Sequence, residues 1–130
     1  MNTFKLLETI FDDCSCPSAY VKCQSIHSEV SSYDDVFKFM SGLVYNDFGG
    51  RKVVCALTKH INAIQEIRFG REYSPVMYVR PRMFDKHYRK LQGAAKRSRL
   101  ASLLRLLKSL NADECWEVNP ETHEIRAWWD

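Results

Sequence analysis

The chain has 130 residues, 45% hydrophobic and 27% charged, a balance typical of a globular protein, so we expect one domain over residues 1–130. No segment approaches the roughly 20 consecutive apolar residues of a membrane span, and five cysteines are an odd number for a disulfide framework. We therefore expect no membrane partner and a cytoplasmic protein. Its formal net charge is only +3.

The N-terminal half, about residues 1–50, is predicted to be helical. Apolar residues recur at helical spacing over residues 2–11, which predicts a short amphipathic helix. The stretch 19–30 fits neither the helical nor the strand period. A second helix is expected over about residues 31–44, because Ser and Asp residues at its start can cap it and the following NDFGG turn should end it.

The second half, about residues 51–130, is predicted to combine helices with short strands. Apolar residues at steps of three and four over residues 53–67 predict a helix that stops near Gly70. The β-forming run at residues 75–80 predicts a strand. Pro81 suits the first turn of a further helix, because its missing N–H costs nothing there.

The C-terminal elements suggest a known arrangement. Residues 95–110 place several leucines on one face, which predicts a helix, and residues 115–118 and 123–129 predict the two strands of a hairpin. The order helix, strand, helix, helix, hairpin over residues 53–129 resembles that of a winged helix, a helix-turn-helix variant with a β-hairpin wing. The sequence therefore predicts an α+β fold, mainly helical with a C-terminal hairpin, whose second half is basic and winged-helix-like.

The basic segment, residues 80–108, is the main candidate for a binding site. It contains ten Lys or Arg residues and one acid, a formal charge of +9, so the remaining residues must carry −6 to reach the total of +3. Lys and Arg side chains on the solvent faces of helices can neutralise phosphates, which predicts DNA or RNA as the partner. The candidate nucleic-acid-binding residues are Arg82, Lys86, Arg89, Lys90, Lys96, Arg97, Arg99, Arg105 and Lys108.

The same basic residues have a second interpretation. They can form a solvated face balanced by acids of the same protein, six of which lie within residues 112–130. Our leading interpretation is a small non-enzymatic DNA- or RNA-binding regulator or accessory protein. The alternative is an inhibitor or adaptor that docks on a larger protein assembly. For docking, the candidate residues are Arg126, Trp128 and Trp129 on the hairpin. Consecutive strand residues face opposite ways, so we expect one Trp in the core and the other outside.

Two further motifs have chemical interpretations. Cys14, Cys16, Cys23 and His27 are candidate zinc ligands, because three thiolates and an imidazole can complete a tetrahedral site. A single residue between Cys14 and Cys16 is an unusually short spacing for a zinc site. The alternative is that these cysteines are buried thiols without metal. We therefore expect no cofactor, with zinc as the alternative and a small metal-dependent enzyme as a third class of function. The GGRK sequence at residues 49–52 can cradle a phosphate, but a plain turn is the preferred interpretation.

Overall fold

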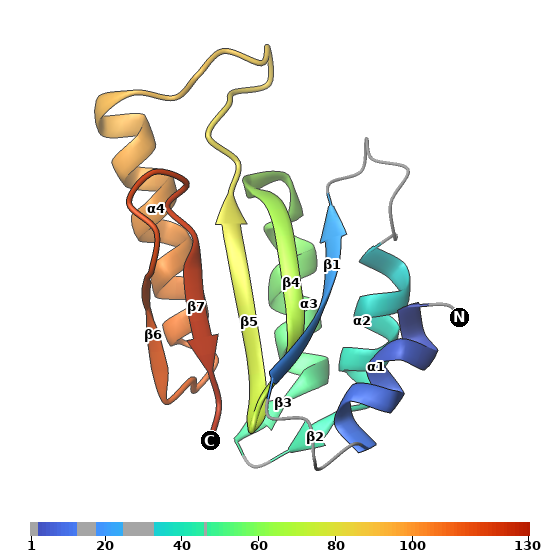
Figure 1. Cartoon of the computed structure of the whole chain (residues 1–130). Coiled ribbons are helices and arrows are strands. Elements are labelled where there is room, and N and C mark those ends of the chain that lie inside the picture. The colour runs from blue at the N-terminus through green and yellow to red at the C-terminus, as the bar shows by residue number, and fades with distance from the viewer. Residues whose placement is uncertain (1–2, 13–17, 25–32, 46) are drawn as a thin grey trace.

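The computed structural model describes residues 3–12, 18–24, 33–45 and 47–130, and its main feature is a five-stranded antiparallel sheet (Figure 1). The strand order is β1-β4-β5-β7-β6, and a separate ribbon pairs β2 with β3. The strands are β1 (Ser18–Gln24), β2 (Val44–Tyr45), β3 (Phe48–Gly49), β4 (Ile64–Glu72), β5 (Ser74–Pro81), β6 (Glu114–Glu117) and β7 (Ile125–Trp128). The helices are α1 (Thr3–Asp12), α2 (Tyr33–Ser41), α3 (Gly50–Lys59) and α4 (Gly93–Lys108), with a short 3-10 turn η1 (Ile61–Ala63).

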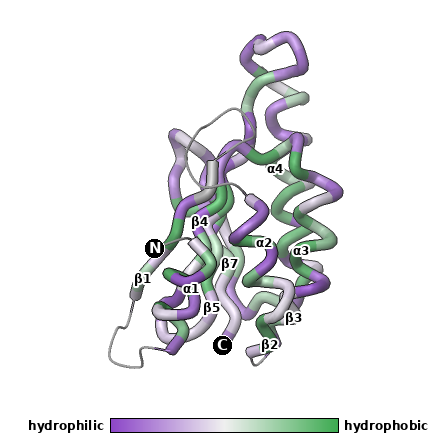
Figure 2. Tube along the Cα trace, turned by 90° about the vertical axis from the view of Figure 1, so that its right-hand side faces the viewer, coloured by the Kyte–Doolittle hydropathy of each residue, from purple (hydrophilic) through white to green (hydrophobic). Residues whose placement is uncertain are grey.

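The core lies between one face of this sheet and the helices. The strand register aligns Val21, Phe69, Met77 and Ala127 in one row across four strands, and all four are buried. Helices α2, α3 and α4 lie on one side of the sheet (Figure 2). Phe11 of α1 stacks on Phe69 with a centroid distance of 5.6 Å, so α1 joins the same core. Because strand side chains alternate, the neighbouring residues of each strand face the opposite side.

The α+β class is confirmed, but the prediction of a mainly helical protein with a C-terminal hairpin is wrong. The hairpin β6–β7 exists, yet β7 pairs with β5, so the hairpin completes the main sheet instead of forming a separate wing. The winged-helix order therefore fails. The helices predicted near residues 2–11, 31–44 and 95–110 and the strand near 75–80 are confirmed with small shifts at their ends.

The helix predicted over residues 53–67 ends early, because α3 stops at Lys59. Ile64 and Ile67 lie on β4, and both are buried. A register irregularity between Ile64 and Glu66 lets these two residues, three apart, share the covered face of a strand. Gly70 does not end a helix; it lies inside β4, where a Cβ would overlap the carbonyl oxygen of Ala19 on β1.

The helix predicted to begin at Pro81 is also absent. Pro81 is the last residue of β5 and pairs with Ile64 on β4. Residues 82–92, which we call the basic loop, connect β5 to α4 and extend beyond the end of the sheet (Figure 1). The side chain of Asp85 hydrogen-bonds the backbone two and four residues ahead, which favours a turn over a continuous helix.

Candidate nucleic-acid interface

The basic loop is held in shape by its own hydrogen bonds. The Asp85 carboxylate accepts from the backbone N–H groups of His87 (2.8 Å) and Arg89 (3.0 Å) and from the Arg89 Nε (3.1 Å). The Arg89 backbone N–H is the main reason that the pKa of Asp85 lies below its usual value. The Leu91 N–H donates to the Met83 carbonyl at 2.8 Å, so the two arms of the loop run side by side.

Two aromatic side chains are exposed among the cations of this loop. Tyr88 has a φ of 60° and is 67% exposed, and the Arg82 guanidinium lies over its ring at 5.3 Å from the centroid. Phe84 is 43% exposed and forms a backbone bridge with Lys90. Exposed rings beside cations offer nucleic acid both stacking and phosphate neutralisation. Sequence reasoning missed these two residues as site candidates, because it placed them on a helix.

Helix α4 carries the other part of the basic surface. Its first turn contains no acid, and its N-cap residue Gln92 makes no side-chain capping hydrogen bond. Lys96 is half-buried near this end, whereas Arg97, Arg105 and Lys108 are exposed. Cations near a helix N-terminus oppose the helix dipole, and a bound anion would relieve that repulsion.

Arg99 connects the basic loop to α4. Its Nη1 donates to the carbonyl oxygens of Arg82 (2.7 Å) and Phe84 (3.0 Å). Arg99 therefore positions the start of the loop relative to the helix. A contact between Arg99 and nucleic acid stays a prediction.

The acids of the C-terminal hairpin are paired with residues outside the basic segment. The pairs and their N–O distances are Glu124–Arg68 (3.2 Å), Glu114–Arg126 (3.5 Å) and Glu117–His123 (3.2 Å). Among the described residues, the basic segment makes a single ion pair, between Asp85 and Arg89 (3.1 Å). Three of the six acids proposed by the second interpretation thus make their close contacts outside the basic segment.

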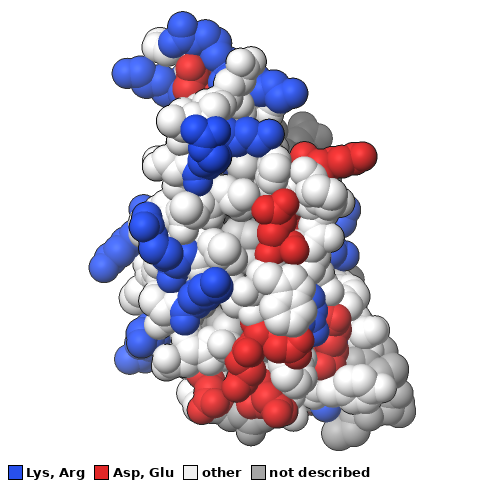
Figure 3. Space-filling view, turned by 90° about the vertical axis from the view of Figure 1, so that its left-hand side faces the viewer, with Lys and Arg blue, Asp and Glu red and all other residues white. Residues whose placement is uncertain are grey.

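The two kinds of charge also occupy different parts of the surface (Figure 3). Lys and Arg gather at the top, over the basic loop, and down one side, over α4. Asp and Glu gather lower down, near β6 and β7. We call the residues exposed in the loop and on α4 the basic surface: Lys86, Arg89, Lys90, Arg97, Arg105 and Lys108.

Trp128 and Trp129 face opposite sides of the sheet, as expected for two consecutive residues in extended backbone. Trp129 is fully buried; its Nε1 donates to the Leu110 carbonyl at 2.9 Å. Trp128 is half-buried on the opposite side of the sheet, where its Nε1 donates to the Glu72 carbonyl at 2.9 Å. Arg126 is held beside it by the Glu72 carboxylate at 3.1 Å. The more exposed hairpin tryptophan is Trp116, at 49%, which the sequence did not single out.

The candidate zinc ligands Cys14, Cys16 and His27 lie outside the described residues, as does the side chain of Cys23 on β1. In the described ranges, no group of three or more His, Cys, Asp or Glu side chains is arranged to hold a metal ion.

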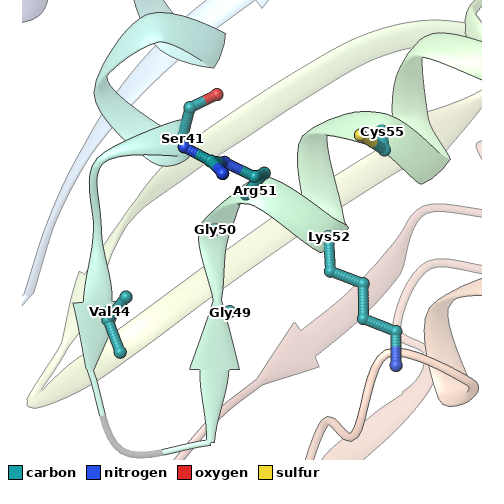
Figure 4. Close-up of a pocket in the computed structure, with 7 residues that line it drawn as sticks. All are labelled: Ser41, Val44, Gly49, Gly50, Arg51, Lys52 and Cys55. Carbon is teal, nitrogen blue, oxygen red and sulfur yellow. The ribbon is translucent and has the colours of Figure 1, made fainter.

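A pocket of about 480 Å³ lies at the start of α3, around the GGRK turn (Figure 4). Arg51 extends toward Ser41, whereas Lys52 points away. A Cβ on Gly50 would overlap the Met40 carbonyl oxygen, so close packing of α2 against α3 requires this glycine. The structure therefore gives the glycine a packing role and favours the turn interpretation.

A second pocket, of about 310 Å³, lies where the basic loop leaves β5. Arg80, Phe84 and Glu121 contribute to its lining. Sequence reasoning missed this pocket, because its residues come from three segments that are far apart in the chain.

Comparison with known proteins gave no match to a family model, to a curated protein or to a solved structure. None of the helices in the described ranges is both long and apolar enough to cross a membrane.

Proposed function

We propose that this protein binds DNA or RNA through the basic surface of the basic loop and α4. The observation that carries the proposal is that acids of the hairpin are paired outside the basic segment while, among the described residues, cations of α4 are not paired with acids. Glu124, Glu117 and Glu114 of the hairpin contact Arg68, His123 and Arg126 in turn, while within the described part of the chain the α4 cations make no ion pair. Uncompensated cations on one surface attract a polyanion, and their counterions are released when phosphates replace them.

The shape of the region supports the same partner. The basic loop extends beyond the sheet and is braced by Asp85, so its cations are presented without a large ordering cost. The exposed Tyr88 ring adds a stacking surface beside them. These features support binding by charge and stacking.

Fluorescence anisotropy with labelled DNA and RNA oligonucleotides tests the proposal. We expect binding at low salt and a steep loss of affinity as salt is raised, because several phosphates are neutralised. The double variant Arg97→Glu/Arg105→Glu should weaken binding by about tenfold or more. The matched control is Arg51→Glu/Lys52→Glu, which makes the same charge change on α3 and should have a much smaller effect. Absence of binding to both polymers at low salt would refute the proposal.

The exposed hairpin favours a second candidate, docking on a protein assembly. Trp116 and Val118 are 49% and 40% exposed, and strand alternation places Glu114 on the same face of β6 as Trp116, a combination of apolar and acidic groups that suits a basic protein surface. This candidate predicts an association in the native host that survives nuclease treatment and is lost in Trp116→Ala. Loss of the association on nuclease treatment would favour the nucleic-acid function.

A further inference from the structure

The pocket beside the basic loop lies at the junction of three segments. Residues of β4, of the run from the end of β5 into the loop, and of the turn between β6 and β7 all contribute to it. Its volume of about 310 Å³ is at the small end of the range for ligand pockets. Its lining includes Gln65, Arg80, Phe84, Glu121 and Thr122. A site of this size suits a single nucleobase, and its place beside the basic surface suits a nucleic acid bound there.

The Arg80 side chain contributes hydrogen-bond donors to the lining of the pocket. Its Nε is buried and has no hydrogen-bond partner among the described residues. A buried donor without an acceptor is destabilising, and a charged one more so. The other guanidinium N–H groups of Arg80 can donate to acceptors of a ligand bound in this pocket.

The rest of the lining selects a base over a phosphate. Phe84 provides an aromatic ring, and Arg99 holds its backbone in place through the Phe84 carbonyl at 3.0 Å. Glu121 places a carboxylate in the same lining, which would repel a phosphate. Gln65 and Thr122 add groups that can both donate and accept hydrogen bonds. A ring system with acceptors on one edge and donors on another fits this combination.

We propose that this pocket binds one unpaired guanine of a single-stranded nucleic acid, an inference that rests on the proposed function. Guanine presents O6 and N7 to an arginine, and its N2 amino group can donate to a carboxylate. Adenine has a single acceptor, N7, beside its amino group on that edge, and thymine has no amino group, so neither offers Arg80 and Glu121 the same set of groups. A guanine in a duplex is stacked between its neighbours, so the pocket takes it only from a single strand or after it is flipped out.

The test compares a labelled oligothymidylate with the same strand carrying one central guanine, in deoxy and ribo forms, by anisotropy. The wild-type protein should bind the guanine strand about tenfold more tightly, the effect of one good bidentate contact. A central adenine should give no such gain, and pairing the guanine in a duplex should abolish it.

Two variants separate the pocket from the basic surface. Arg80→Met should abolish the guanine preference. Arg105→Met, a matched loss of charge on α4, should weaken the binding of both strands and keep the preference. Glu121→Ala should also abolish the preference, yet leave oligothymidylate binding unchanged or stronger, because an acid is removed. Both pocket variants are checked for folding by circular dichroism, and Glu121→Ala, on an exposed turn, keeps the test valid if Arg80→Met does not fold.

The outcomes distinguish this inference from the proposed function. Equal binding of the guanine, adenine and thymine strands would overturn the guanine pocket and leave the basic surface intact. A preference that survives in Arg80→Met and Glu121→Ala would overturn it as well. Failure of every strand to bind at low salt would overturn both proposals.

Discussion

Arg99 on α4 donates a 2.7 Å hydrogen bond to the backbone carbonyl of Arg82, and its second bond, to Phe84, spans the start of the basic loop. A cation of the basic segment thus holds the backbone that carries the other cations. This relationship divides the basic residues into one that positions the loop and several that are free to face a partner.

Arg99→Lys should separate these two roles. A lysine keeps the charge, but its side chain is one bond shorter than the path to the Arg99 Nη1, which donates both hydrogen bonds, so it cannot reach the two carbonyls in the same way. We expect a loss of about 1 kcal/mol in the free energy of unfolding, the size of one net hydrogen bond, and faster amide hydrogen exchange over residues 84–91. Unchanged exchange in these residues would contradict the positioning role.

Asp85→Ala should weaken nucleic-acid binding although it removes a negative charge. Without the carboxylate, the N–H groups of His87 and Arg89 lose their acceptor, and the loop must be ordered at the moment of binding. Ordering costs of this kind correspond to a loss of about threefold to tenfold in affinity. A tighter complex would show that charge outweighs loop order. Asp47→Ala, which also removes an exposed acid but at the β2–β3 turn at the other end of the molecule, is the comparison and should leave the affinity nearly unchanged.

Gly70→Ala should destabilise the fold. A Cβ at this position would overlap the Ala19 carbonyl oxygen on β1, so the two strands must move apart. We expect a loss of about 2 kcal/mol in urea unfolding. The control is Gly49→Ala, where a Cβ has no neighbour within 4 Å and the φ is −98°. Equal stability of the two variants would contradict the close approach of β1 and β4.

The stability of the protein should decrease at alkaline pH because of Tyr78. Burial, together with the hydrogen bond and charge of Glu72, raises the pKa of Tyr78 from 10.0 to about 12. The folded state therefore favours the neutral phenol. Its contribution is complete below a pH of about 10 and is lost as the pH rises toward the folded value.

Urea unfolding of the wild type and Tyr78→Phe across this alkaline range measures that contribution. Lysines and other tyrosines titrate there in both proteins, so the difference between the two proteins isolates Tyr78. The wild type should lose more stability than the variant. Parallel losses would show that Tyr78 titrates alike in the folded and unfolded chains.

Elements with a strong local signal were predictable from the sequence. The leucine periodicity of α4 and the turn between two β-forming runs at the C-terminus depend on neighbours in the chain. The opposite orientations of Trp128 and Trp129 follow from the alternation of a strand. The helix predicted over residues 53–67 was too long, because a spacing of three fits a helix and also a strand with an irregular register.

The sequence by itself determined the concentration of positive charge in residues 80–108 and the acidity of the remainder. Only the tertiary structure decided that β7 pairs with β5 and that Glu124, Glu117 and Glu114 pair with Arg68, His123 and Arg126. The tertiary structure also places Arg80 and Glu121 in the lining of one pocket. Charge composition is a property of the residues, whereas ion pairing and pocket formation depend on distances between segments that strand pairing brings together.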